Sequence, residues 1–151
     1  EVMLIQLLPE QISKYWDELE RAFLEALPDI AERNQESMNN MLAFILAGGM
    51  QVWISVPRME IDENTLDIRS VLATKFVEDE VSRTFSLDIY ALYNYKDMSF
   101  KEWREDLEAL KKFARAHYCS RIIGRSSVPG LVAISKKMGA NTDYTLISFD
   151  L

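Results

Sequence analysis

The stretch of sequence that decides the fold is residues 114–151, which read ARAHYCSRIIGRSSVPGLVAISKKMGANTDYTLISFDL. The segment Arg121–Gly124, with Ile122 and Ile123 at its centre, is typical of a short strand, and Pro129 suits the first turn of a helix that follows it. Gly139 suits the C′ position at which such a helix ends. Residues 144–151 then predict a closing strand. The stretch therefore predicts strand, helix and strand in succession, as in an α/β domain.

A long helix precedes this stretch. Ser99 and Glu102 match the capping box, in which two side chains satisfy backbone N–H groups at a helix start. Behind the cap, apolar residues recur at helical spacing as far as His117, which predicts one buried face. These residues are Phe100, Trp103, Leu107, Leu110 and the pair Phe113/Ala114.

The remaining elements follow from period and from proline and glycine breaks. The expected strands are 3–8, 51–56, 66–76 and 83–93, and the expected helices are 10–27 and 35–47. The complete order is β-α-α-β-β-β-α-β-α-β. No linker or repeat divides it, so we predict one α/β domain spanning residues 1–151.

Composition excludes several classes of function. The 151 residues carry a net charge of -7 with scattered basic residues, which argues against nucleic-acid binding. No apolar run is long enough to cross a bilayer, so no membrane association is expected. One cysteine and one histidine exclude an internal disulfide and disfavour a zinc site. We predict a soluble, acidic, cytoplasmic protein without a metal.

The segment Ile134–Ala140, ISKKMGA, resembles the Leu-Tyr-x-x-x-Gly-Phe pattern of Gcn5-related N-acetyltransferases (the GNAT superfamily). The order of elements resembles that family along nearly the whole chain. The resemblance implies a mixed central sheet flanked by helices. Residues 48–53, GGMQVW, are similar to GNAT-like proteins of tailed bacteriophages, which implies action in the host cytoplasm.

The resemblance also implies an acetyl-CoA site, and this chain departs from it. The family holds the pyrophosphate on a glycine-rich loop at a helix N-terminus, where backbone N–H groups attract the anion. Residues 94–101 here read NYKDMSFK and contain no glycine. The candidate cofactor-binding residues that remain are Tyr95, Lys96, Ser99 and Lys101.

By the same resemblance, Ser135 takes the place of the tyrosine that serves the family as general acid. A serine hydroxyl is a much poorer proton donor than a phenol. Tyr93 is a second catalytic candidate, with packing at the cleft rim as its alternative interpretation. Glu60 is a candidate base for an amine substrate, and a solvated acidic loop is its alternative.

Two functional hypotheses follow. The first is a GNAT-like protein, phage-encoded, that lacks efficient acetyl-CoA catalysis, needs no cofactor and acts through a protein partner or a homo-oligomer. The second is an acetyl-CoA-dependent N-acetyltransferase acting on an amine of a small molecule or protein.

Overall fold

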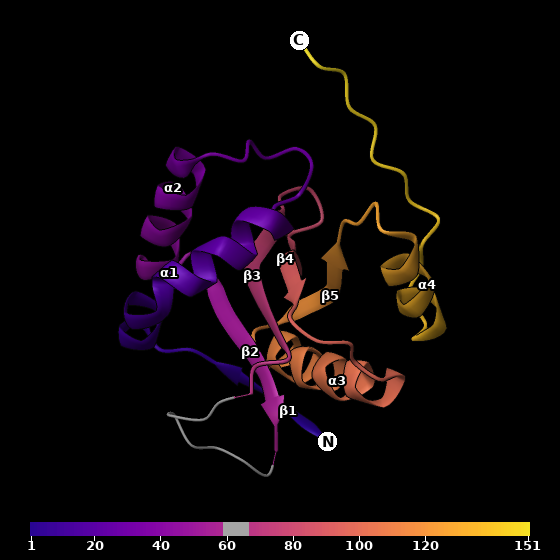
Figure 1. Cartoon of the computed structure of the whole chain (residues 1–151). Coiled ribbons are helices and arrows are strands. Elements are labelled where there is room, and N and C mark those ends of the chain that lie inside the picture. The colour runs from indigo at the N-terminus through magenta and orange to yellow at the C-terminus, as the bar shows by residue number, and fades with distance from the viewer. Residues whose placement is uncertain (59–66) are drawn as a thin grey trace.

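The computed structural model describes residues 1–58 and 67–151 of the chain (Figure 1). Its strands are β1 Val2–Gln6, β2 Gln51–Pro57, β3 Ser70–Asp79, β4 Thr84–Asn94 and β5 Cys119–Gly124. Its helices are α1 Pro9–Ala26, α2 Gln35–Leu46, α3 Phe100–Ala116 and α4 Pro129–Lys137. The expected α/β fold class is confirmed, as are nine of the ten expected elements.

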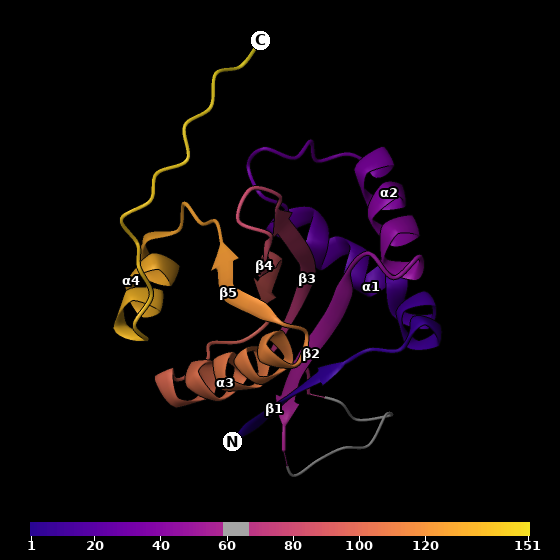
Figure 2. The ribbon, with the colours of Figure 1, turned by 180° about the vertical axis from the view of Figure 1, so that it is seen from behind.

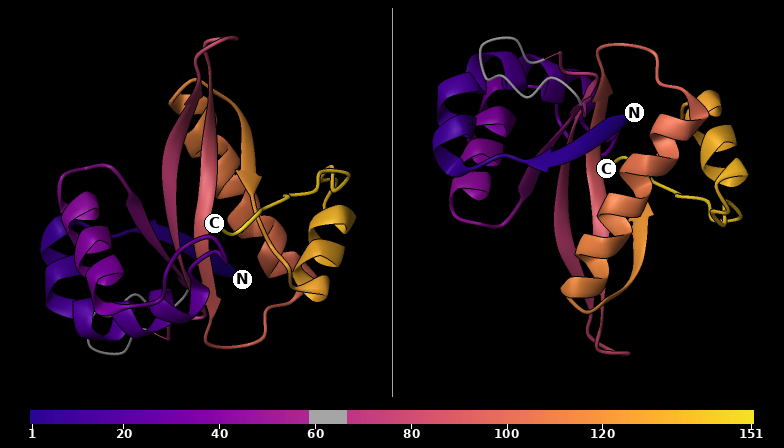
Figure 3. Two further views of the ribbon diagram at one scale, coloured as in Figure 1. Left: turned by 90° about the horizontal axis from the view of Figure 1, so that it is seen from above. Right: turned by 90° about the horizontal axis from the view of Figure 1, so that it is seen from below.

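The five strands form one mixed sheet in the order β1-β2-β3-β4-β5. Neighbours from β1 to β4 are antiparallel, whereas β5 runs parallel to β4. Helices α1 and α2 cover one face, and α3 covers the other (Figures 2 and 3). Strand β2 is buried along almost its whole length, because both of its faces are covered.

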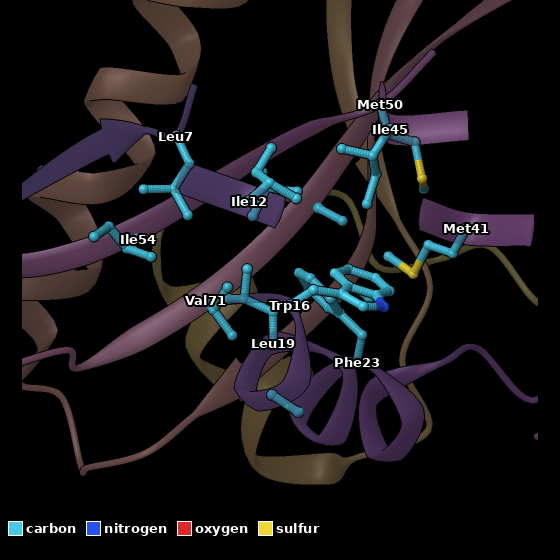
Figure 4. Close-up of a cluster of buried hydrophobic side chains, with 14 of the residues drawn as sticks. Leu7, Ile12, Trp16, Leu19, Phe23, Met41, Ile45, Met50, Ile54 and Val71 are labelled. Atoms are coloured by element: carbon cyan, nitrogen blue, oxygen red, sulfur yellow. The ribbon is translucent and has the colours of Figure 1, made fainter. Parts of the chain in front are cut away.

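Each face of the sheet carries its own core. The larger one lies under α1 and α2, where the apolar side of α1 packs on residues of β2, β3 and β4 (Figure 4). The smaller core lies under α3 and consists of Trp53, Leu72, Leu87, Leu110 and Ala114. Within it, the Trp53 indole N–H donates to the Thr74 hydroxyl at 2.9 Å, so the buried nitrogen keeps a partner.

The capping box of α3 is confirmed, since Ser99 accepts from the Glu102 N–H and Glu102 accepts from the Ser99 N–H. The buried face of this helix agrees with the predicted one at Leu110 and Ala114 and differs from it in the first half of the helix. Its buried residues are Asp106, Leu110 and Ala114, while Trp103 and Leu107 are half-buried. The carboxylate of Asp106 therefore lies on the buried face, where the apolar spacing alone predicts Trp103 and Leu107.

The prediction of a closing strand at residues 144–151 is wrong. Residues 140–151 are extended, but they make no ladder with any strand of the described residues. A strand is defined by its partner as well as by its side-chain period, and the five-stranded sheet provides none for this segment. Helix α4 beside it has no buried residue.

No helix of the described residues is long and apolar enough to cross a membrane. The same part of the chain contains no cluster of three His, Cys, Asp or Glu side chains arranged to hold a metal ion.

Candidate cofactor cleft

The candidate cofactor site begins where β4 and β5 separate. Thr74 pairs with Ile89 but Ala73 pairs with Ala91, so Tyr90 is an extra residue that makes a β-bulge in β4. The β4–β5 pairing ends at the same place, with Ile89 opposite Gly124. The second half of β4 therefore presents a backbone edge with no strand on its β5 side in the described structure. An extended ligand could pair with such an edge.

Two tyrosines mark the far end of this edge. The rings of Tyr93 and Tyr95 meet edge to face, with their centroids 5.0 Å apart. Tyr93 is half-buried against the larger core, and Tyr95 is 44% exposed. Burial raises the pKa of the Tyr95 phenol, and that of the Tyr90 phenol at the bulge, above the usual value. Both phenols are therefore weaker acids than a free tyrosine.

The N-terminus of α3, where an anion would bind, is closed by side chains of the chain itself. Glu102 places one carboxylate oxygen on the Ser99 N–H at 3.0 Å. Its other oxygen lies 3.2 Å from the Arg69 guanidinium. This carboxylate occupies the helix end that attracts negative charge, and it also pairs with the nearest arginine.

The basic residue of the preceding loop is paired as well. Lys96 donates to the Asp67 carboxylate, and that hydrogen bond holds the pKa of Asp67 below its usual value. Asp67 also lies 3.5 Å from Arg69. The backbone locks the arrangement, because the Arg69 carbonyl accepts the N–H groups of Tyr95 and Lys96.

These contacts do not fit a bound pyrophosphate. Two of the four candidate cofactor-binding residues, Lys96 and Ser99, are engaged within the chain, and Tyr95 is packed against Tyr93. Lys101 is exposed at the start of α3. A polyanion would have to displace the Glu102 carboxylate and compete with Asp67, in a loop without the glycines that allow close approach.

The catalytic candidates are not gathered into one described site. The Ser135 hydroxyl donates to the Leu131 carbonyl at 2.8 Å, a bond within α4 itself. Tyr93 lies on β4, beyond the bulge. Glu60 lies outside the described residues. The α4 end nearest Ser135 meets the start of α3, where the Lys137 ammonium is 4.3 Å from the centre of the Phe100 ring.

A further buried pair lies beside the candidate cofactor site. Asp88 on β4 is 1% exposed and accepts from the Arg125 guanidinium at 3.0 Å. Its other oxygen is buried without a hydrogen-bond partner among the described residues. The pair ties the β5–α4 connection to β4 next to the bulge. The sequence signal is a lone carboxylate between the apolar residues Leu87 and Ile89.

Several solved structures have a fold similar to that of this chain. The chain matches a ribosomal-protein-alanine N-acetyltransferase from Brucella melitensis biovar Abortus 2308 at 10% identity, with a TM-score of 0.67 and 100% and 99% of the two chains covered. It matches a GNAT family acetyltransferase from Staphylococcus aureus at 10% identity, with a TM-score of 0.65 and coverage of 99% and 98%. A predicted acetyltransferase from Clostridium acetobutylicum, solved with acetyl-CoA, matches at 13% identity, with a TM-score of 0.62 and coverage of 98% and 96%.

No protein-family model matches the sequence, and no curated protein matches it significantly. The likeness to these solved structures shows that the chain has the GNAT fold. At identities this low, the structural likeness shows the fold but does not show the activity.

Proposed function

We propose that this chain is a GNAT-fold protein that does not use acetyl-CoA efficiently and acts through protein contacts. The observation that carries the proposal is the closed N-terminus of α3, where Glu102 occupies the anion position and pairs with Arg69. The lysine of the same loop is held by Asp67. Family resemblance assigns this place to the pyrophosphate.

Among the described residues, the hydroxyl groups of Ser135, Tyr90 and Tyr95 are poor proton donors for catalysis. The Ser135 hydroxyl already donates within α4. The phenols of Tyr90 and Tyr95 have pKa values raised by burial, so they give up a proton less readily at neutral pH. The resemblance of residues 48–53 to tailed-phage proteins adds the proposal of a phage origin, which the genes flanking its coding sequence would test.

The alternative is an acetyl-CoA-dependent N-acetyltransferase acting on an amine. The Tyr90 bulge and the separation of β4 from β5 favour it, because they leave a backbone edge for an extended ligand. The buried Asp88 adds a carboxylate close to that edge.

A thiol-release assay separates the two functions. Acetyl-CoA is mixed with the protein and with a peptide, a polyamine or an aminoglycoside as acceptor, and the CoA thiol is followed with a chromogenic reagent. We expect release at the rate of the protein-free control. Turnover above that rate that is lost in Tyr93→Phe would instead support the enzyme.

A further inference from the structure

The β3–β4 hairpin carries an open strand edge that the candidate cofactor site does not use. Strand β2 pairs with β3 only as far as Thr74, which lies opposite Gln51. Residues 75–79 of β3 pair with β4 alone among the described strands. This half of the hairpin projects past helices α1 and α2 (Figure 3). An open edge of this kind can pair with one more strand.

The direction of the free backbone groups follows from the ladders in the inner half of the sheet. The Leu7 N–H donates to the Val52 carbonyl at 2.8 Å, so the even-numbered residues of β2 face β1 and the odd-numbered residues face β3. Each odd-numbered residue of β2 lies opposite an even-numbered residue of β3. By the same alternation, Phe76 and Glu78 turn their backbone N–H and C=O groups toward the open edge.

Exposed apolar side chains stand on both faces of this edge. The Phe76 ring is 37% exposed and packs on the α3 side against the rings of Phe113 and His117, whose centroids are 5.8 and 5.2 Å away. Val77, on the opposite face, is also 37% exposed. Because Phe76 is held by two neighbouring rings and valine has a stiff side chain, covering them costs little side-chain entropy.

The charges of this edge are arranged so that it complements itself. Residues 75–79 read Lys-Phe-Val-Glu-Asp. When a second copy pairs antiparallel about Val77, its Asp79 lies opposite Lys75 and its Lys75 lies opposite Asp79. Both pairs bring opposite charges together on the face that carries Val77, and such cross-strand pairs stabilise a sheet. Parallel pairing in register would instead set like charges side by side.

Both charged groups are available for these pairs. The Asp79 carboxylate accepts the backbone N–H groups of Ser82 and Val81, and these bonds hold the pKa of Asp79 below its usual value, so the group is charged. Both bonds use Oδ1, which leaves Oδ2 for a lysine. The Lys75 ammonium lies 5.0 Å from the centre of the Tyr90 ring, and its flexible stem allows it to turn toward the edge.

We propose that two copies of this chain associate through residues 75–79 of β3, which pair antiparallel about a two-fold axis at Val77. Phe76 of each copy then exchanges both of its backbone hydrogen bonds with Glu78 of the other, and the two Val77 side chains meet at the axis. Beyond Asp79 each chain turns back toward its own β4, away from the shared edge. The proposal goes beyond the function proposed above and holds whether or not acetyl-CoA binds.

The first test is the mass of the full chain in solution, measured by analytical ultracentrifugation at up to about 200 μM. We expect twice the mass of one chain at the highest concentration. Val77→Glu sets two like charges face to face at the axis and should give the mass of one chain. Its circular dichroism spectrum should be unchanged, because Val77 lies outside both cores. The matched control is Ile147→Glu, at a 73% exposed site, which should stay dimeric.

The second test fixes the register, in a background in which Cys119→Ser removes the single native thiol. Residues directly opposite in a non-hydrogen-bonded antiparallel pair have Cα atoms about 4.5 Å apart, within reach of a disulfide. Val77→Cys lies opposite itself and should form a covalent dimer on mild oxidation. Lys75→Cys lies opposite residue 79 of the second copy and should not.

Three results contradict the proposed association. One is a wild type that stays monomeric at the highest concentration. Another is a dimer that survives Val77→Glu. The third is a covalent dimer that forms as readily from Lys75→Cys as from Val77→Cys.

Discussion

Replacing Asp106 by asparagine should stabilise the protein at neutral pH. Asp106 lies on the buried face of α3 and is 7% exposed. One of its carboxylate oxygens is buried without a hydrogen-bond partner among the described residues. Burial raises its pKa from 3.8 to about 6, the carboxylates of Glu105 and Glu102 reinforce the rise, and the Ser55 hydroxyl opposes it.

The sign of the effect follows from proton binding. Because its pKa is higher in the folded state, the folded protein holds this proton more tightly than the unfolded chain. Below pH 3.8 the ionisation of Asp106 therefore does not destabilise the folded state. The destabilisation grows as the pH rises to about 6 and reaches its full size above that pH. The shift corresponds to about 3 kcal/mol at 1.36 kcal/mol per unit, and relaxation with water entry reduces it to about 1–3 kcal/mol.

The assay is urea unfolding of wild type and Asp106→Asn between pH 4 and pH 7.5. Because the two proteins share all other acidic groups, the difference between their free energies of unfolding reports the titration of Asp106 alone. We expect the variant to gain about 1–3 kcal/mol at pH 7.5, equivalent to roughly 2–10 °C in melting temperature, and close to nothing at pH 4. Glu108→Gln, at an exposed site of the same helix, is the control and should show no such dependence. A difference that stays constant with pH, or a variant less stable at pH 7.5, would refute the reasoning.

Two further substitutions test local features. Tyr118 has a φ of +62° between α3 and β5 and is 90% exposed, so Tyr118→Gly should relieve backbone strain and raise the free energy of unfolding by about 0.5–1 kcal/mol in urea melts. A loss of stability would show that the ring makes a contact that outweighs the strain. Arg125→Ala leaves the Asp88 carboxylate buried without its partner and should cost about 2–4 kcal/mol. Arg125→Ala in an Asp88→Asn background should cost less than about 1 kcal/mol, and equal costs in both backgrounds would mean that the ion pair is not responsible.

Much of the fold could be predicted from local signals. The capping box at Ser99 and the breaks at Pro28 and Gly48 place helix ends to within a residue or two, because caps and breakers act over a single turn. The phase of α3 could not be predicted from apolar spacing. Its buried face includes Asp106, and a carboxylate is assigned to solvent unless its tertiary surroundings are known.

The candidate cofactor site was less predictable because its contacts join distant parts of the chain. The missing glycines of residues 94–101 are visible in the sequence, but the pairing of Lys96 with Asp67 and of Glu102 with Arg69 is not. The Tyr90 bulge depends on the register of β3 against β4, which no local pattern sets. For residues 144–151, the period predicts strand geometry, but a strand also needs an edge to pair with.

We propose that the closed α3 N-terminus prevents acetyl-CoA binding, and a thermal shift with the cofactor tests this most directly. A ligand with a Kd near ~10 μM, present at ~1 mM, stabilises a folded protein by about 2.7 kcal/mol. For a domain of this size that is at least ~5 °C in melting temperature. We predict a shift below ~1 °C with acetyl-CoA for the wild type, within the weak attraction of a helix end for anions. A wild-type shift of ~5 °C or more that disappears in Lys96→Glu would contradict the account and assign the chain to the acetyltransferases.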